Sequence, residues 1–305
     1  MPQDMMNTKE VARYLDIHEK QVYALIREDK IPCTKVTGKW LFPKNLIDEW
    51  ILKSAKSGMK EARAKSLHVA GSLLAAGSND PVLDMLIACL REAHPEFYIF
   101  TAGTGSLEGL SALKRGYVDL AWCHLFDPES GLYNIPYVER ILQGFPAVVV
   151  NLFRREVGLL AAPGNPLKIN GIKDLAEDGR RFVNRQNGSG IRLLFDHLLS
   201  GEGITPEMIA GYDRHVCTHL DVGLAVLSGG ADAGIATVAV ARLLNLEFIP
   251  ITVENFDMIL SHSVFFEKPV QSLIDMLRSP EFKERVRPFG EYDFTGSGKI
   301  LYSLT

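Results

Sequence analysis

The chain has 305 residues, 47% hydrophobic and 23% charged, which is enough apolar material for two folded domains and excludes a wholly disordered protein. It has no apolar run of the roughly 18 residues that span a bilayer, and its first ten residues lack the apolar core of a signal peptide, so we expect a cytoplasmic protein without a membrane span. The four cysteines are scattered without a C-x-x-C pair, which argues against a zinc cluster or a disulfide framework.

Charge is distributed unevenly along the chain. Residues 1–65 contain 13 Lys and Arg against nine Asp and Glu, a net charge of +4, whereas the other 240 residues contain 20 against 28, a net charge of −8. A small basic head on a larger acidic body suggests that the head binds a polyanion and that the body has another role.

The head, residues 1–52, is predicted to be a winged helix-turn-helix domain. Asn7 or Thr8 can cap a first helix, and Glu10 completes a capping box with Asn7. Thr37-Gly38 suits the tight turn of a two-stranded wing. The expected order is a helix at 7–15, a turn at 16–18, a second helix at 19–29, a hairpin at 31–43 and a third helix from residue 43.

A specific motif runs through this head. Its members are Thr8, Glu10-Val11-Ala12, Leu15, Val22-Tyr23, Leu25-Ile26, Ile31-Pro32, Lys35, Trp40 and Phe42. The motif resembles that of the excisionase-type, MerR-like DNA-binding domain. The resemblance implies that the second helix enters the major groove and that the wing contacts phosphates or the minor groove.

The candidate DNA-contacting residues are Lys20, Gln21, Tyr23 and Arg27 on the second helix, and Lys35 and Lys39 on the wing. The alternative is that they are solvated surface residues of a small protein-binding module, with Tyr23 and Trp40 in its core. Residues 53–65 follow with five positive charges and one negative, which predicts a basic linker.

Residues 66–305 alternate strand-like and helical segments, which predicts an α/β domain with a mostly parallel sheet. Strands are expected at 66–72, 97–103, 118–124, 181–184, 213–218, 231–237 and 247–252, and helices at 81–93, 106–116, 189–200, 219–229, 238–246 and within 270–289. A long β run at 147–161 indicates a crossover between two lobes. We expect lobe I at about 66–152 and 254–305, and lobe II at about 153–253.

The loops that join strands to helices carry hydroxyl, amide and basic residues. The candidate ligand-binding residues are Ser78, Asn79, Thr104, Ser106, His124, Arg185, Ser189, Arg192, Thr218 and His219. Hydroxyls and free N–H groups at helix N-termini suit an anion in a cleft between lobes. The alternative for each loop is an ordinary helix cap.

Four segments of the body, 124–138, 184–192, 203–214 and 218–236, resemble the PBP-like domain, which is similar to molybdate-binding proteins and to the ligand domains of LysR-type regulators. Ile191 and Gly223 stand where this family usually has Thr and Ala. The first replacement would remove a hydroxyl from the site. The resemblance implies a bilobal periplasmic-binding-protein-like fold.

The candidate anions differ in whether they carry a hydrogen at neutral pH. Molybdate and tungstate are fully deprotonated and need only donors, whereas hydrogen phosphate also needs an acceptor. Asp80 is the candidate acceptor, although a cap of the helix that begins at residue 81 is the favoured role for it. Arg185 and Arg192 could neutralise the charge of the ligand. A tetrahedral oxyanion is therefore expected first and a small organic anion second.

The whole chain is predicted to be a cytoplasmic one-component transcription regulator, homodimeric, that binds DNA and senses molybdate or tungstate without a cofactor, a metal or catalytic residues. One alternative is an enzyme that uses His124, Asp127 and His219 as acid–base groups and Ser189 as nucleophile, although no nucleophile elbow, H-E-x-x-H, Walker or Rossmann motif is present. The other is an architectural DNA-binding protein whose body is only a scaffold.

Overall fold

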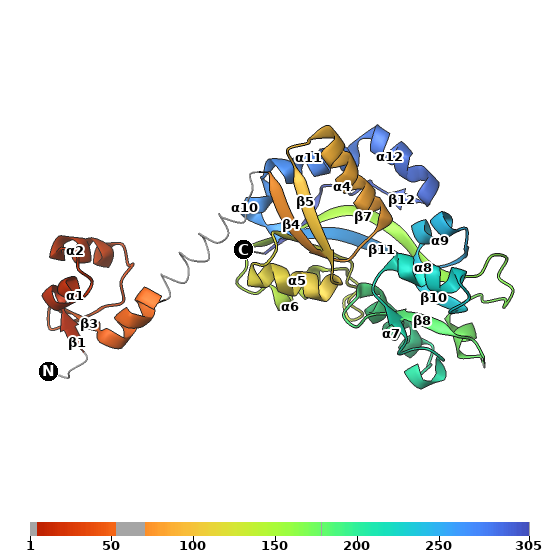
Figure 1. The fold of residues 1–305 in the computed structure, drawn as a ribbon. Coiled ribbons are helices and arrows are strands. Elements are labelled where there is room, and N and C mark those ends of the chain that lie inside the picture. Colours follow the sequence, from red (N-terminus) through yellow and green to blue (C-terminus); the bar gives the residue numbers. More distant parts are fainter. Residues whose placement is uncertain (1–4, 53–70, 178, 305) are drawn as a thin grey trace. The chain divides into compact units, whose positions relative to one another are not determined.

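The computed structural model describes residues 5–52, 71–177 and 179–304, and it divides the chain into two compact units, Met1–Val69 and Ala70–Thr305 (Figure 1). We call them the N-terminal unit and the C-terminal unit. The predicted linker at 53–65 and most of the strand expected at 66–72 lie outside the described residues.

The N-terminal unit is a helix-turn-helix domain with a wing. Its elements are β1 (Met5–Asn7), α1 (Thr8–Tyr14), α2 (Glu19–Arg27), β2 (Thr34–Val36), β3 (Lys39–Pro43) and helical residues 44–52. The strands form a sheet in the order β1-β3-β2, in which β1, absent from the sequence prediction, pairs antiparallel with β3.

Local sequence explains these boundaries. Asn7 Oδ1 accepts hydrogen bonds from the N–H groups of Lys9 and Glu10, and the Glu10 carboxylate accepts from the Asn7 N–H, so the predicted capping box starts α1. Thr37 and Gly38 have φ values of 49° and 84°, the left-handed conformation that a tight hairpin turn requires.

A single twisted sheet of ten strands organises the C-terminal unit. The strands are β4 (Ser72–Gly77), β5 (Tyr98–Gly103), β6 (Leu120–Cys123), β7 (Ala147–Ala161), β8 (Phe182–Arg185), β9 (His215–Val216), β10 (Ala233–Thr237), β11 (Glu247–Ser261), β12 (Tyr292–Asp293) and β13 (Ile300–Leu304). Their main order is β5-β4-β6-β11-β7-β10-β8-β9, with β12 and β13 also paired to β7.

The centre of this sheet joins two lobes. β4 is parallel to β5 and β6 in lobe I, and β8 is parallel to β9 and β10 in lobe II. Between them, β7 and β11 run antiparallel along nearly their whole length, side by side in Figure 1. The predicted lobe boundaries, 152/153 and 253/254, fall inside these two strands. The sheet is therefore parallel in each lobe and antiparallel where the chain crosses between the lobes, which refines the predicted mostly parallel sheet.

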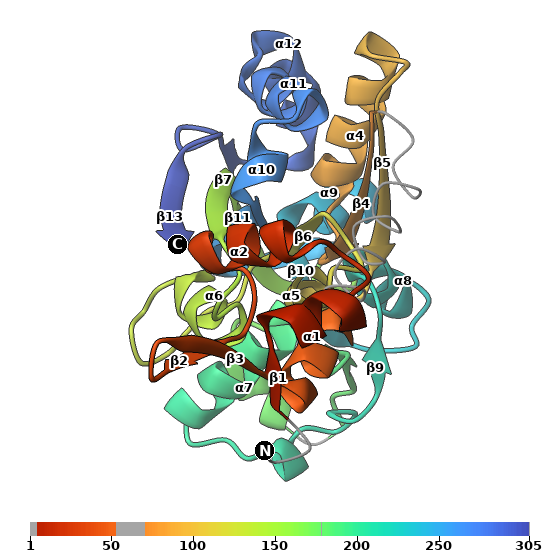
Figure 2. The same cartoon turned by 90° about the vertical axis from the view of Figure 1, so that its left-hand side faces the viewer.

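Helices cover both faces of each lobe. Lobe I has α4 (Pro81–Ala93), α5 (Ser106–Arg115), α6 (Ile135–Ile141), α10 (His262–Phe265), α11 (Lys268–Arg278) and α12 (Pro280–Val286). Lobe II has α7 (Gly190–Gly201), α8 (His219–Leu227) and α9 (Val238–Leu244). Three short 3-10 turns lie at Ile172–Ala176, Pro206–Met208 and Arg287–Phe289. In Figure 2, α4, α11 and α12 lie at one end of the C-terminal unit and α7 at the other.

Apolar side chains fill the space between sheet and helices on each face. In lobe I, Leu86 and Leu273 belong to one buried cluster and Leu110 to a second on the opposite face. In lobe II, Phe195 and Val222 occupy the corresponding two clusters. Each lobe thus has its own core, and β7 and β11 contribute to all four clusters or to the apolar residues packed against them.

The structure corrects several sequence-based boundaries. β4, at Ser72–Gly77, extends beyond the strand expected at 66–72, of which residues 66–70 lie outside the described part of the chain, and β9 is shorter than the expected 213–218. β11 extends to Ser261, and α6, β12 and β13 were not predicted. Most of β4 was missed because its small residues, Ala75, Ala76 and Gly77, resemble a loop in sequence, although they are buried between β5 and β6.

Gly158 of β7 tests the close packing of the crossing strands. A Cβ atom there would lie 2.2 Å from the carbonyl oxygen of Ile249 and 2.8 Å from the Phe248 ring. Gly158→Ala should therefore destabilise the C-terminal unit by about 1–3 kcal/mol. Urea unfolding can measure this, with Gly171→Ala as the control, because a Cβ at Gly171 meets open space. Equal stability of the two variants would contradict the packing described.

Candidate functional site

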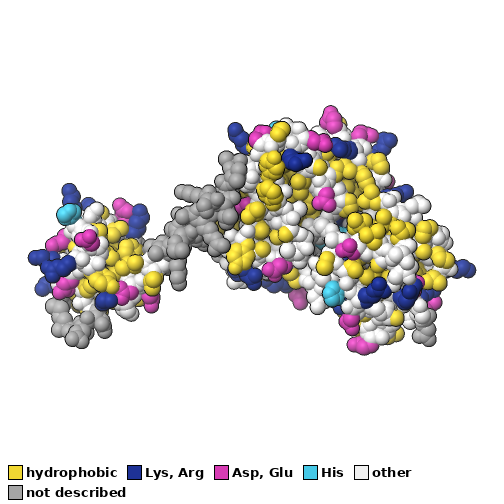
Figure 3. Space-filling view, in the orientation of Figure 1, with side chains coloured by type: hydrophobic (Ala, Val, Ile, Leu, Met, Phe, Trp, Pro, Cys, Tyr) yellow, Lys and Arg dark blue, Asp and Glu magenta, His cyan; other side chains and the backbone are white. Residues whose placement is uncertain are grey.

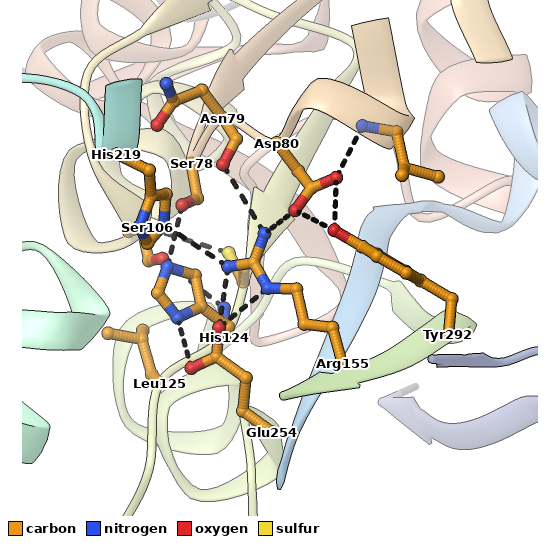
Figure 4. Close-up of polar contacts among 12 residues, drawn as sticks. Ser78, Asn79, Asp80, Ser106, His124, Leu125, Arg155, His219, Glu254 and Tyr292 are labelled. Atoms are coloured by element: carbon orange, nitrogen blue, oxygen red, sulfur yellow. Dashed lines mark hydrogen bonds and ion pairs between the residues drawn. The ribbon is translucent and has the colours of Figure 1, made fainter. Parts of the chain in front are cut away.

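A buried charged cluster lies where the crossing strands meet lobe I (Figure 4). Arg155 of β7 and Glu254 of β11 are register partners, and the Arg155 Nε donates to Glu254 Oε1 at 2.8 Å. The Arg155 Nη1 also forms an ion pair with Asp80 Oδ2 at the start of α4. All three side chains are at most 1% exposed. One guanidinium therefore joins both crossing strands to a helix N-terminus of lobe I.

The cluster continues from Glu254 to two side chains of lobe I. Glu254 Oε2 lies 2.9 Å from His124 Nδ1, and His124 Nε2 lies 2.7 Å from the Ser78 Oγ. The backbone N–H of His124 donates to the Ser106 Oγ at 3.3 Å. These residues follow β4, β5 and β6, whose carboxyl ends meet at one edge of the sheet.

Burial and charge set the protonation states of the cluster. Burial would raise the pKa of Glu254, but His124 and Arg155 outweigh it and hold that pKa below its usual value. Burial lowers the pKa of His124, against the attraction of Glu254, and it lowers the pKa of His219 well below the usual range, with Arg185 and Arg155 adding to the effect. At neutral pH the carboxylate is therefore ionised and both imidazoles are neutral.

Lobe II contributes donors that have no acceptor. Arg185 at the end of β8 is 2% exposed, and its Nη2 donates to the Cys217 carbonyl oxygen at 2.8 Å. Its Nε and Nη1, and the Nδ1 of His219, are buried without a hydrogen-bond partner among the described residues. Burial, followed by repulsion from Arg155, lowers the pKa of Arg185 to about 10.

The tautomer of the neutral His219 ring follows from the contact that its Nε2 makes. Its Nε2 lies 3.5 Å from the Arg155 Nη2, which can only donate, so Nε2 is the acceptor. The Nδ1 of the neutral ring then carries the hydrogen. Buried donors without an acceptor are rare in proteins and each requires an explanation. Here three donor nitrogens from two residues have no acceptor among the described residues. An anion, which accepts hydrogen bonds, would pair with them.

The two lobes touch beside this cluster. The Leu107 N–H of lobe I donates to the Gly188 carbonyl oxygen of lobe II at 3.3 Å. A Cβ at Gly190, the first residue of α7, would lie 2.5 Å from the His124 carbonyl oxygen and 2.7 Å from its ring. Only glycine therefore allows the start of α7 to approach His124 this closely.

The structure brings some predicted ligand residues together and leaves others outside. Ser78, Ser106, His124 and His219 meet in the cluster (Figure 4), and Arg185 lies near enough to lower the pKa of His219. Asn79 contributes its backbone oxygen, which lies 3.5 Å from the Arg155 Nη1. Ser189 and Thr218 cap α7 and α8 by accepting the N–H groups of Arg192 and Asp221, so their hydroxyl hydrogens stay available to a ligand.

Two predicted ligand residues lie elsewhere. Thr104 is exposed, and its hydroxyl donates to the neighbouring Gly105 carbonyl oxygen at 3.4 Å. The Arg192 guanidinium stacks on the Tyr212 ring, with 4.0 Å between Cζ and the ring centroid, and its Nε pairs with Asp196. Each has a local structural role.

The departures from the family motif have packing explanations. Ile191 is 1% exposed and belongs to the apolar core of lobe II, so its side chain is directed away from the polar cluster. A Cβ at Gly223 would lie 2.6 Å from Leu244 and Val240, so this glycine lets α8 pack closely on α9. Ile191 therefore contributes to the packing of the lobe II core, which is a different role from the site hydroxyl that the family motif suggested at this position.

Sequence reasoning missed Arg155 and Glu254, whereas it favoured a helix cap for Asp80. The signal for Arg155 and Glu254 was available, because an Arg inside the apolar run 147–161 and a Glu beside the apolar run after residue 254 are costly unless paired. Asp80 caps α4 through the Val82 N–H, as one alternative held, and it also accepts from Tyr292 and Arg155.

The residues weighed for catalysis do not form one group. Asp127 accepts hydrogen bonds from Ser130 and Arg140 and is engaged there, and Ser189 is a helix cap.

Within residues 5–52, 71–177 and 179–304, no three His, Cys, Asp or Glu side chains are grouped as metal ligands would be. Over the same ranges, no helix combines the length and apolar character needed to cross a membrane.

The N-terminal unit carries its candidate contacts on its surface, where Figure 3 shows Lys and Arg side chains. All six predicted DNA-contacting residues are exposed, and Tyr23, at 46% exposure, lies outside the core. A hollow of about 560 Å³ between α2 and the wing is lined by Lys20, Tyr23, Arg27 and Trp40 among others. The Gln21 side chain accepts from the His18 N–H and so also caps α2.

Comparisons with known proteins agree with both halves of the fold. Residues 87–278 match the PBP superfamily domain family, and residues 5–55 match a helix-turn-helix domain family. The uncharacterized protein YvgK of Bacillus subtilis (strain 168) is 31% identical over 305 residues, which cover 96% of each chain.

Two solved structures are similar to this chain in fold. The tungstate ABC transporter structure from Geobacter sulfurreducens has 15% identity and a TM-score of 0.51, covering 71% of this chain and 97% of that one. A putative phosphate ABC transporter substrate-binding protein with bound phosphate, from Clostridium perfringens, has 15% identity and a TM-score of 0.51, covering 75% and 99%. At this identity the similarity extends to the fold alone.

Gly190→Ala tests the contact between the lobes. The added methyl group would collide with His124, so the lobes should separate and the Leu107 N–H should lose its partner. We expect hydrogen exchange in the segment around Leu107 to accelerate by about tenfold or more. Gly201→Ala, at the open end of α7, is the matched control and should exchange like the parent. Unchanged exchange in Gly190→Ala would refute this lobe contact.

Proposed function

The chain belongs to the PBP superfamily domain family and carries a helix-turn-helix domain at its N-terminus, and from this premise we propose that it is a DNA-binding transcription regulator whose C-terminal unit senses a small anion. The N-terminal unit would bind DNA through α2 and the wing. The C-terminal unit would bind the anion between its lobes.

One observation carries the anion assignment. Arg185 Nε, Arg185 Nη1 and His219 Nδ1 are buried donors without an acceptor among the described residues. Leaving a buried donor unpaired costs about 1–3 kcal/mol, and more for a charged group. An anion held by these donors would recover that cost, and it would favour the charged Arg185 that burial and Arg155 now disfavour.

We propose a tetrahedral oxyanion as the ligand, with molybdate or tungstate as the candidates from sequence and hydrogen phosphate as the alternative. The two proteins of similar fold described above are a tungstate ABC transporter and a putative phosphate ABC transporter substrate-binding protein with bound phosphate. Asp80, the candidate acceptor for the hydrogen of phosphate, is already engaged by Arg155, Tyr292 and the Val82 N–H. A small organic anion is the second choice.

Regulation would follow from binding at both lobes. The hydroxyl groups of Ser78 and Ser106 belong to lobe I, whereas the unpaired donors of Arg185 and His219 belong to lobe II, so an anion that contacts both sets favours the closed arrangement. A winged unit of this size gains affinity from a second copy on a neighbouring half-site, and we therefore propose a homodimer. Binding to chromosomal DNA implies a cytoplasmic protein.

A second candidate function is hydrolysis, because Ser78, His124 and Glu254 are spaced like a nucleophile, base and orienting acid. Against it, the Ser78 N–H already donates to the Trp122 carbonyl oxygen, so it is not an oxyanion donor. Turnover of a candidate ester, lost in His124→Ala, would favour this function. The architectural alternative requires a C-terminal unit that binds no ligand.

Arg185→Gln tests the anion site. A thermal-shift screen of the full chain with molybdate, tungstate, phosphate, sulfate and small carboxylates should reveal an anion that raises the melting temperature. Arg185→Gln should weaken binding of that anion by about 100-fold, since it removes a buried charge and two donors. Arg181→Gln, which breaks only an exposed ion pair with Asp232, should bind like the parent. Equal affinity in Arg185→Gln would refute the assignment.

The DNA-binding surface can be tested with Lys20→Ala combined with Arg27→Ala. Both residues are exposed on α2, and we expect operator affinity to fall about tenfold or more and its salt dependence to become shallower. Lys114→Ala with Arg115→Ala removes the same charges from the exposed last turn of α5 and is the control. A gel-shift titration in which both pairs behave alike would contradict a recognition role for α2.

A further inference from the structure

The hydrogen bonds around Ser78 have a direction that bears on which anion the site accepts. Glu254 Oε1 lies 2.8 Å from Nε and 2.6 Å from Nη2 of Arg155, and Oε2 faces His124 Nδ1 at 2.9 Å. An ionised carboxylate only accepts hydrogen bonds, so Nδ1 carries the hydrogen. In the neutral ring, Nε2 is then an acceptor, and the Ser78 hydroxyl must donate to it across 2.7 Å.

This direction leaves Ser78 with lone pairs and no hydrogen for a ligand. A fully deprotonated oxyanion, which can only accept, would face an acceptor at this position. An oxyanion that keeps one hydrogen can donate it to the Ser78 Oγ. If His124 instead takes up a proton, Nε2 donates to Ser78, and the Ser78 hydroxyl turns to donate to the ligand.

The charges around His124 also favour its protonation when a fully deprotonated anion binds. The groups that face it are Ser78 from the β4–α4 loop, Arg155 from β7, Glu254 from β11, His219 from α8 and, at longer range, Arg185 from β8. Asp80 belongs to the cluster through its ion pair with Arg155. The two arginines balance the two carboxylates, so the cluster is neutral when both imidazoles are neutral. A buried dianion without a counter-charge is costly, so a proton on His124 favours the binding of tungstate, whereas monohydrogen phosphate, which is also a dianion, differs from tungstate in the hydrogen that it can donate to Ser78.

On the basis of the proposed anion site, we infer that the Ser78–His124–Glu254 chain is its specificity-determining element and admits a tetrahedral oxyanion only together with one proton. A monohydrogen anion of the phosphate class brings that proton itself and is the preferred ligand above neutral pH. Molybdate, tungstate or sulfate binds only as His124 takes a proton from solution.

The test is calorimetry on the full chain, with tungstate and inorganic phosphate each titrated in two buffers of different ionisation enthalpy. Tungstate should bind with uptake of about one proton, and its affinity should fall about tenfold per pH unit as the pH rises, because a neutral His124 must be protonated first. Monohydrogen phosphate should bind with little uptake and a flatter pH dependence. Tungstate binding without proton uptake would overturn this inference alone, whereas no binding by either anion would overturn it together with the proposed oxyanion site.

The variant Glu254→Gln tests whether Glu254 determines which nitrogen of His124 carries the hydrogen. The new amide oxygen would accept from Arg155, and its NH2 group would donate to His124 Nδ1, which moves the ring hydrogen to Nε2. Ser78 could then donate to a fully deprotonated anion, so tungstate should bind with near-zero proton uptake and no pH slope. Glu247→Gln, at an exposed position of the same strand, should keep the parent's uptake. If a folded Glu254→Gln variant binds tungstate with the same proton uptake as the parent, the role assigned to the Ser78–His124–Glu254 chain is contradicted. If that variant does not fold, the parent's proton count remains decisive.

Discussion

The geometry of the buried polar cluster depends on one guanidinium. Arg155 projects from β7 at the point where the chain passes between lobes, and it pairs with Glu254 on β11 and with Asp80 at the start of α4. Such a pair adds little net stability, because its desolvation offsets its attraction, but removing one partner leaves a buried charge uncompensated and costs about 3–5 kcal/mol. Its effect is therefore positional, since it ties the N-terminus of α4 to both crossing strands and fixes Glu254 against His124.

Under the proposed function, the same arrangement would let the site respond to an anion. Lobe I presents Ser78 and His124, whose hydrogen bonds are satisfied, whereas lobe II presents Arg185 and His219, whose donors are not. Gly190 lets these two sets approach each other. Binding energy gained at the unpaired donors can therefore hold together two lobes that are linked by only two long strands.

Much of the fold was predictable because periodicity and turn chemistry are local. The capping box at Asn7 and the turn at Thr37-Gly38 were predicted residue by residue and are confirmed. The positions of α4 and of β7 agree to the residue with the predicted segments at 81–93 and 147–161. Residues 73–77 of β4 were not predicted as strand, because a central strand with helices on both faces can consist of small residues without alternation.

The site was predictable only in part, because its partners are distant in sequence. Loops at strand ends correctly indicated Ser78, His124 and Arg185 as polar residues to examine, but nothing local places Glu254 against His124 across 130 residues. Hydroxyl residues at helix starts have two meanings, and Ser189 and Thr218 illustrate both, since each caps its helix while keeping a hydrogen to donate. Burial of Arg155 inside an apolar strand was the strongest signal left unused.

A crystal structure of the full chain with the anion that stabilises it most would test the account most directly. The account predicts that the anion lies within hydrogen-bonding distance of Arg185 Nε and His219 Nδ1, with Ser78 on the side of lobe I. An anion bound elsewhere on the chain, with these donors satisfied by water or by other protein groups, would contradict it.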